Sequence, residues 1–350
     1  MSTRVVVGMS GGVDSSVAAA VLKQQGYEVV GVSMRLWDDT PAADAEKAAA
    51  HLGIPLHVLD FRAEFEKAVI EPFISEYVNG RTPNPCIVCN QYLKFGAMLR
   101  AAEQLNAQYA ATGHYAVVER EPQSQRYILK QAGASEKDQT YVLYHLTQAQ
   151  LGRVLFPLGA FPDKAAVRQM AEALQLPAAD KPDSQEICFI PDRDYAAFIV
   201  RRTGRQPESG NFVDMDGNVL GRHRGILHYT VGQRKGLGIA FGKPMFVTGI
   251  CAADNTVILG EKGQEFAKVL YADRLNFIPF DAPEGPFRVM AKVRYSARPA
   301  AAWACVAEGR LRVVFDTPQR AIAPGQAVVL YQPDSPIVIG GGTICESAAG

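Results

Sequence analysis

The first 110 residues alternate short apolar strands with helices, and this alternation restricts the possible folds more than any other feature. Strands are predicted over 4–9, 28–37, 55–60 and 107–113. Helices are predicted over 15–25, 44–53, 61–80 and 91–106, and glycines end the first two. Strands that alternate with helices pair in parallel, and helices cover both faces of the sheet. The sequence therefore predicts an α/β domain built on a parallel sheet.

The remainder of the chain has a different character. Helical patterns continue over 146–156 and 163–176, whereas short strands, frequent Gly and turn pairs such as Asp-Gly begin near Asn211. We therefore expect two small β-rich modules after the α/β part. No stretch approaches the roughly 20 apolar residues that cross a bilayer. The N-terminus also lacks the pattern of a signal peptide, so the sequence predicts a cytoplasmic protein without a membrane partner.

The segment SGGVDSS, residues 10–16, lies between the first predicted strand and the first predicted helix. Its glycines let backbone N–H groups turn toward one point, where the helix N-terminus adds the positive end of its dipole. Serine hydroxyls supply further uncharged donors, and Asp14 can reach a metal ion or cap the helix. The segment has neither the Lys of a Walker loop nor the Gly spacing of a dinucleotide site. It predicts a phosphate-binding loop of another kind.

Three of the six cysteines stand in unusual contexts. Cys86 and Cys89 have C-x-x-C spacing in a Pro-rich loop that opens a helix, and a helix N-terminus favours the thiolate. Cys188 follows 99 residues after Cys89 in KPDSQEICFIPD, a polar context that is atypical of a buried strand. Six cysteines in 350 residues are too sparse for a disulfide scaffold. These three thiols are therefore candidates for chemistry.

The charges balance over the whole chain, with 36 basic and 36 acidic residues, but they do not balance locally. Residues 193–243 contain 9 Lys and Arg against 4 Asp and Glu, and residues 288–320 contain 7 against 2. Such counts are compatible with solvated surfaces and with faces that bind nucleic acid. The β-rich modules are candidates for the second role.

The loop resembles the SGG-x-DS signature of the ATP pyrophosphatase (PP-loop) superfamily, whose members split ATP between its α and β phosphates and adenylate a substrate oxygen. Further segments extend the resemblance, over about residues 4–345, to the tRNA-specific 2-thiouridylase family. These segments are GRTPNPCIVCN, ATGHYA, KDQTYVL, KPDSQEICFIP, HRGILHYTVGQRKGLGI, VRYSARP and PGQAVVLY. The resemblance implies a catalytic PP-loop domain over 1–200, a central β-rich tRNA-binding domain over 201–275 and a C-terminal β-barrel domain over 276–350.

The same resemblance implies an enzyme that uses ATP and Mg²⁺ to replace the C2 oxygen of the tRNA wobble uridine by sulfur. Its implied partners are tRNAs, in this family those for Lys, Glu and Gln, and a persulfide-carrying donor protein or a cysteine desulfurase. Cys89 matches the family's nucleophile, and Cys188 matches the residue that carries the persulfide. Attack of Cys89 on Cys188 would release sulfur to the base and leave a disulfide between the two.

The remaining site residues follow position by position from the resemblance. Those matching the ATP site are Gly8, Met9, Ser10, Gly11, Gly12, Val13, Asp14, Ser15, Met34 and Gly113, with Asp14 as a candidate Mg²⁺ ligand. Those matching the stretch that touches the target base are Asn84, Pro85 and Cys86. Those matching tRNA contacts are His114, Lys137, Asp138, Gln139, Arg294, Tyr295 and Gln326.

One departure from the family concerns Cys86, because some members carry Asp there, where it is thought to assist proton movement. A thiol is a poorer general base than a carboxylate unless its pKa is lowered, so the group that manages the proton stays open. A cysteine at this position also suits another mechanism. Cys86, Cys89 and Cys188 are compatible with an iron–sulfur cluster that carries sulfide on an open iron.

Two other functions are less well supported by the sequence. A PP-loop synthetase that makes small molecules with ammonia needs no cysteine pair, and the chain contains no glutaminase segment. An RNA-binding module with a degenerate nucleotide site does not explain the intact SGGVDSS loop.

Overall fold

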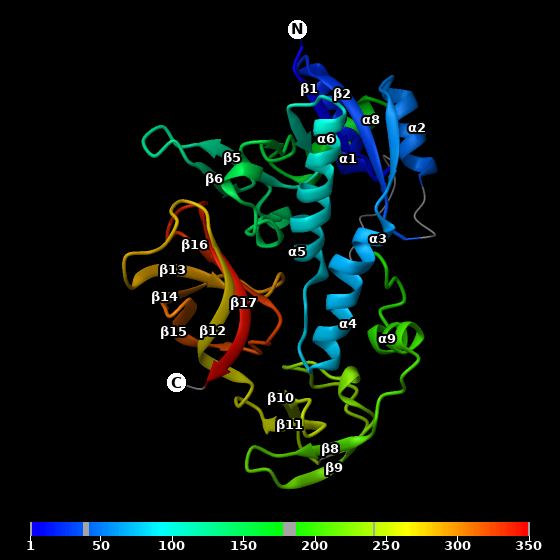
Figure 1. Ribbon diagram of the computed structural model, residues 1–350. Coiled ribbons are helices and arrows are strands. Elements are labelled where there is room, and N and C mark those ends of the chain that lie inside the picture. The colour runs from blue at the N-terminus through cyan, green and yellow to red at the C-terminus, as the bar shows by residue number, and fades with distance from the viewer. Residues whose placement is uncertain (1, 38–41, 178–186, 241, 349–350) are drawn as a thin grey trace.

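The computed structural model describes residues 2–37, 42–177, 187–240 and 242–348. Its N-terminal part is a five-stranded parallel sheet in the order β3-β2-β1-β4-β7, seen at the top of Figure 1. These strands are β1 Arg4–Gly8, β2 Glu28–Arg35, β3 Leu56–Asp60, β4 Tyr109–Ala111 and β7 Val154–Leu155. Val5, Val6 and Val7 in the central β1 are fully buried, as expected for a strand covered on both faces. The predicted parallel sheet is confirmed.

Helices follow the strands as predicted, with one exception. The helices that flank the sheet are α1 Val13–Gln24, α2 Ala43–Leu52, α6 Met98–Gln104 and α8 Lys164–Ala173. The segment 146–156, predicted to be one helix, contains the short α7 Gln148–Leu151 and then the edge strand β7. Gly152 ends α7 where a Cβ atom would lie 2.8 Å from the Tyr127 ring. The β-branched Val154 then pairs with Ala110 in the sheet.

Two long helical columns descend from the sheet toward the β-rich modules (Figure 1). The first consists of α3 Arg62–Phe65, the π-helical segment η1 Glu66–Ile70 and α4 Glu71–Val78. The second consists of α5 Pro85–Cys89, the π-helical segment η2 Asn90–Ala97 and α6. It begins at Pro85 rather than at the predicted residue 91, because Asn84 caps it by accepting a hydrogen bond from the Cys86 N–H at 3.1 Å. Both cysteines of the C-x-x-C pair therefore lie on this helix.

Two β structures complete the chain. The first is a four-stranded sheet in the order β10-β11-β8-β9, built from β8 Gly210–Val213, β9 Val219–His223, β10 Met245–Cys251 and β11 Thr256–Glu261. The second is a closed six-stranded barrel of β12 Phe266–Phe277, β13 Phe287–Lys292, β14 Ala300–Ala307, β15 Arg310–Arg320, β16 Ala327–Tyr331 and β17 Val338–Ala348. The predicted fold class, a parallel-sheet domain followed by two β-rich domains with a C-terminal barrel, is confirmed. The boundaries at residues 200 and 275 stay a prediction.

The barrel packs directly on the α/β part. One hydrophobic cluster contains Val6 of β1 and Phe95 together with Val329, Tyr331 and other residues of the barrel. The Tyr141 hydroxyl donates to the Ala327 carbonyl at 2.9 Å across the same contact. Among the described residues, no helix has the length and apolar character needed to cross a membrane.

Candidate functional site

The phosphate loop connects β1 to α1 and keeps its donors available. Gly12 is the N-cap of α1, and no side chain caps the helix there. The serine hydroxyls support the loop instead: Ser15 and Ser16 donate to the Gly12 carbonyl at 3.1 and 2.9 Å, and Ser15 Oγ accepts from the Ser10 N–H at 3.2 Å. The first turn of α1 therefore presents backbone N–H groups and the positive end of the helix dipole to an anion.

Two glycines allow the close packing of this loop. Gly11 has φ +75°, and a Cβ atom there would lie 2.4 Å from Asp44 Cβ at the start of α2. A Cβ atom on Gly113, after β4, would lie 2.7 Å from the carbonyl carbon of Asp14. Larger residues at either position would displace the loop backbone. The predicted ATP-site residue Gly113 thus lies against the predicted phosphate loop.

Asp14 has partners that the sequence did not indicate. The Lys164 ammonium, at the start of α8, lies 2.6 Å from Asp14 Oδ1, and the Tyr115 hydroxyl donates to the same oxygen at 2.8 Å. The Lys164 side chain is only 9 % exposed, so this cation is held at the loop. Sequence reasoning missed Lys164 because 150 residues separate it from Asp14. A Walker loop carries a lysine in its own motif, whereas here a lysine from another helix lies at the loop, paired with Asp14.

Met34 lies near the C-terminal end of β2, beside β1, at the sheet edge where the loop also lies. A cavity of about 200 Å³ adjoins it, lined by Ser33, Met34, Arg35, Ala42 and Val58. Ligands of open α/β sheets bind at this edge. Met34 and the loop are therefore placed where one nucleotide can reach both.

The structure brings Cys188 to the Cys86–Cys89 pair. Phe189, next to Cys188, packs edge-on against Phe65 at 5.4 Å between ring centroids, in the hydrophobic cluster that contains Cys89. Cys89 is buried, whereas Cys86 and Cys188 are exposed, and all three are free thiols. Residues 183–186, the polar stretch before Cys188, lie outside the described residues.

The three thiols also influence one another electrostatically. Surrounding protein atoms raise the pKa of Cys188 to about 12, although its side chain is partly exposed, and Cys89 and Cys86 raise it further. Surrounding protein atoms also raise the pKa of the buried Cys89 and of Cys86, whose side chain is partly exposed, and Lys94 opposes the rise in every case. Thiolates are the reactive forms of cysteine, and the surroundings of these three residues disfavour the thiolate.

His114 packs against the helical column that carries Cys89, and its neighbour Gly113 packs against the phosphate loop. It follows Gly113, its Nδ1 lies 2.7 Å from Thr112 Oγ1, and its ring packs on Phe95 with centroids 5.7 Å apart. Burial lowers the pKa of His114 well below its usual value, so the ring is neutral. At 8 % exposure, His114 is an interior residue of the site rather than an open surface.

The other predicted tRNA residues divide into interior and exposed groups. Asp138 is buried and accepts from Thr140 Oγ1 at 2.7 Å, and Gln139 Oε1 accepts from the Tyr115 N–H at 3.0 Å. Arg294 donates to the carbonyls of Val231 and Ala321 at 2.8 and 2.5 Å, which joins the segment between β9 and β10 to the barrel. Tyr295 is 45 % exposed. Lys137 is half-buried in the short helix Ser135–Lys137.

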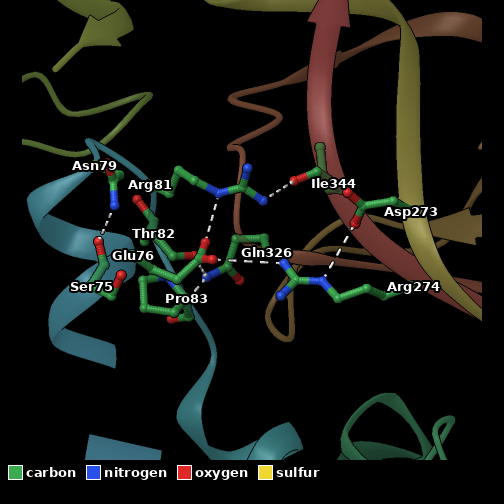
Figure 2. A network of polar contacts seen from close by, with 10 residues as sticks. All are labelled: Ser75, Glu76, Asn79, Arg81, Thr82, Pro83, Asp273, Arg274, Gln326 and Ile344. Atoms are coloured by element: carbon green, nitrogen blue, oxygen red, sulfur yellow. Dashed lines mark hydrogen bonds and ion pairs between the residues drawn. The ribbon is translucent and has the colours of Figure 1, made fainter. Parts of the chain in front are cut away.

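Gln326 belongs to a polar network between the barrel and the segment before Asn84 (Figure 2). Gln326 Nε2 donates to the Thr82 carbonyl at 2.8 Å, and the Thr82 N–H donates to the Pro324 carbonyl at 2.8 Å. We call these two contacts the barrel latch. Arg81 extends it, because its guanidinium lies 2.6 Å from Glu76 and reaches the Ile344 carbonyl at 3.5 Å. The helix that carries Cys86 and Cys89 begins at Pro85, three residues after Thr82.

The three cysteines do not form a metal-binding arrangement. Among the described residues, which include Cys86, Cys89 and Cys188, no group of three or more His, Cys, Asp or Glu side chains is arranged to hold a metal ion. The iron–sulfur interpretation is therefore unsupported by the geometry of its expected ligands.

The chain matches three protein-family models and is similar in sequence to known proteins. Models described as tRNA methyl transferase HUP domain, tRNA methyl transferase PRC-barrel domain and aminomethyltransferase β-barrel domain match residues 3–192, 196–261 and 267–344. A tRNA-specific 2-thiouridylase MnmA of Acetivibrio thermocellus is 53 % identical over 357 residues, covering 97 % of this chain and 99 % of the relative. The protein of the same name from Clostridioides difficile is 49 % identical, covering 99 % of each.

Among solved structures, a 4-thiouridine synthetase bound to RNA and ATP is similar with a TM-score of 0.38 and 18 % identity. The match covers 55 % of this chain and 46 % of that one. A likeness at this level carries no functional information.

Proposed function

We propose that this chain, which belongs to the tRNA-specific 2-thiouridylase family, catalyses ATP-dependent 2-thiolation of the wobble uridine of tRNA with the residues described above. The observation that supports the proposal best is the packing of the Cys188 segment, through Phe189, in the hydrophobic cluster that contains Cys89, 99 residues away in the sequence. Gly113 contacts the loop and the adjacent His114 contacts the helix that bears Cys89. These two contacts support a single site for ATP and the two thiols.

Activation of the base comes first. The C2 oxygen of the uridine attacks the α-phosphate of ATP, which forms a C2–O–AMP bond and releases pyrophosphate. The N–H groups at the start of α1 and the Lys164 ammonium supply positive charge where the pyrophosphate leaves. A carbonyl oxygen is a poor leaving group, whereas AMP is a good one, so this step makes sulfur transfer possible.

Sulfur transfer follows at the cysteines. The terminal sulfur of a Cys188 persulfide attacks C2 and expels AMP, so that the base is bound through sulfur to Cys188. The Cys89 thiolate then attacks Cys188 Sγ, the sulfur–sulfur bond breaks, and its electron pair leaves with the sulfur on C2. The products are 2-thiouridine and a Cys89–Cys188 disulfide, which an external thiol reduces before a donor persulfide reloads Cys188.

Mg²⁺ has one candidate protein ligand in this arrangement. Lys164 and Tyr115 both bind Asp14 Oδ1, and the second carboxylate oxygen, Oδ2, is the candidate ligand for a metal ion. One carboxylate fits Mg²⁺, which takes most of its ligands from phosphates and water when it binds with a nucleotide. The ion would supply charge neutralisation for the phosphates.

The predicted partners follow from the family. Substrates are wobble-uridine tRNAs, in the family those for Lys, Glu and Gln, and sulfur comes from a persulfide-carrying protein or a cysteine desulfurase in the cytoplasm. Tyr295, in the segment that follows β13 of the barrel, supports a tRNA-binding role for the barrel because its ring is exposed. The basic excess of the β-rich parts supports the same placement.

The direct test uses unmodified tRNA transcripts for Lys, Glu and Gln with ATP, Mg²⁺ and a persulfide donor. Nucleoside mass spectrometry should show 2-thiouridine, with AMP and pyrophosphate formed in equal amounts. Omission of ATP should abolish the product. A chain that binds tRNA but forms neither AMP nor thiouridine would have another function.

Tyr295→Ala should weaken tRNA binding more than it changes ATP use. The centroid of the exposed Tyr295 ring lies 5.5 Å from Lys292 Nζ, and the ring offers a stacking face to a base. Loss of one such stack raises Kd about fivefold to a hundredfold. Filter binding of tRNA measures the change, and Tyr295→Phe is the control because it keeps the ring. Equal Kd values for the alanine variant and the wild type would remove Tyr295 from the tRNA surface.

A further inference from the structure

Lys94 shares a helical column with the cysteines. It lies in η2, five residues after Cys89. In a π-helix the hydrogen bonds join residues five apart, as between the Met98 N–H and the Leu93 carbonyl, so residues at this spacing lie roughly one above the other. The next residue, Phe95, packs on His114 and fixes the orientation of the helix. Lys94 is therefore held one turn from Cys89.

Among the residues that the structure describes, no acidic side chain pairs with Lys94. In the part of the chain that the structure describes, Lys94 makes no ion pair or hydrogen bond, and its side chain is half-buried. A cation removed from water without a carboxylate partner costs stability. By contrast, Lys67 in the other π-helical segment, η1, is exposed. Lys94 therefore has no role as an ion-pair partner among the described residues.

Lys94 influences titratable groups in three separate segments. Surrounding protein atoms raise the pKa of Cys86, Cys89 and Cys188, and for each of them Lys94 acts in the opposite direction. Lys94 also helps to lower the pKa of His114, after burial. These effects agree with the position of Lys94 one helical turn from Cys89.

We propose that Lys94 is the cation of the sulfur-transfer step: its ammonium group stabilises the anions that form in turn on the Cys188 persulfide and on Cys89. This inference rests on the proposed function and assigns a role to a residue that the family resemblance did not bring out. A single fixed charge suits this cycle because the negative charge moves between neighbouring sulfurs while Lys94 stays in place. Adenylation, which takes place at the phosphate loop, does not need Lys94.

The test compares Lys94→Met, which keeps the length of the side chain without its charge, with Lys94→Arg, which keeps the charge. Alkylation of Cys188 by iodoacetamide at neutral pH is followed by peptide mass spectrometry, with Cys305 on the barrel as an internal reference. Lys94→Met should slow Cys188 alkylation about tenfold, the effect of one pKa unit. Lys94→Arg should restore most of the rate, and Lys67→Gln should leave it unchanged.

The same variants are assayed for tRNA adenylation and thiouridine formation. Lys94→Met should form adenylated tRNA at the wild-type rate and lose thiouridine formation about tenfold. An unchanged rate of Cys188 alkylation, a loss that Arg does not restore, or a loss of adenylation would each overturn the proposal. If the wild type itself forms no thiouridine, the proposed function fails, while the thiol rates still decide whether Lys94 activates the cysteines.

Discussion

Replacement of Cys188 by serine should abolish thiouridine formation while tRNA adenylation continues. A hydroxyl cannot carry the transferable sulfur atom, whereas the phosphate loop that activates the base is untouched. We expect a loss of about a thousandfold or more, equivalent to about 4 kcal/mol of transition-state stabilisation. Mass spectrometry of intact tRNA and of its nucleosides measures both products. Thiouridine at the wild-type level would exclude Cys188 as the sulfur carrier.

Cys89→Ser should show the complementary defect. The persulfide on Cys188 can still form and attack the base, but nothing resolves the bond between Cys188 and the transferred sulfur. The expected result is tRNA joined covalently to the protein through Cys188, with no Cys89–Cys188 disulfide. Non-reducing gel electrophoresis detects the conjugate, and reductant should release the tRNA.

Cys86→Ala is the matched control for these two variants, because Cys86 lies on the same helix turn as Cys89 but has no step in the persulfide mechanism. It should keep substantial activity, and Cys86→Asp should be tolerated because Asp occurs there in the family. In a cluster mechanism all three cysteines are ligands. Activity of Cys86→Ala below about 1 % of wild type, a loss of about 2.7 kcal/mol, would therefore favour the cluster.

Asp14→Ala should reduce AMP formation about a hundredfold or more with little change in tRNA binding. Asp14 lies in the first turn of α1, where nucleotide phosphates are expected, and positions Lys164 through the 2.6 Å ion pair. Pyrophosphate release with tRNA present measures the effect. AMP formation at the wild-type rate would refute the assignment.

The double variant Asp14→Ala/Lys164→Ala separates two explanations of that loss. If Asp14 serves only to neutralise Lys164, removal of both charges should recover much of the activity and the stability, because no unpaired ion remains. If the carboxylate acts on the nucleotide or its Mg²⁺, the double variant should stay inactive. Thermal unfolding of both variants separates catalytic loss from misfolding.

The sequence was most informative where one short segment determines its own structure. SGGVDSS contains the turn glycines, the hydroxyls and the helix start that it needs, so its role as an anion-binding loop follows from local chemistry. The parallel sheet followed from alternating apolar strands and helices in the same way. The edge strand β7 was missed because two paired residues after Gly152 are too short to give a periodic pattern.

The features that depend on distant residues were not predictable in the same way. Nothing in the segment around Lys164 indicates an ion pair with Asp14, since only the packing of α8 on α1 brings the two together. The proximity of Cys188 and Cys89 entered through the family resemblance, not through spacing. Several matched tRNA residues, such as Asp138 and Gln139, proved to be bound within the fold, so their interior contacts require the structure.

The barrel latch affects whether the N-terminal α/β part can be isolated without the barrel. Residues 81–83 lead into the cysteine helix, yet their hydrogen-bond partners Pro324, Gln326 and Ile344 come from the far end of the chain. A fragment that stops at residue 200 would contain the thiols and the phosphate loop but would leave this segment without its partners. Exchange of the barrel for that of a relative would likewise change the contacts of the segment that leads into the cysteine helix. The barrel and the cysteine helix should therefore evolve together.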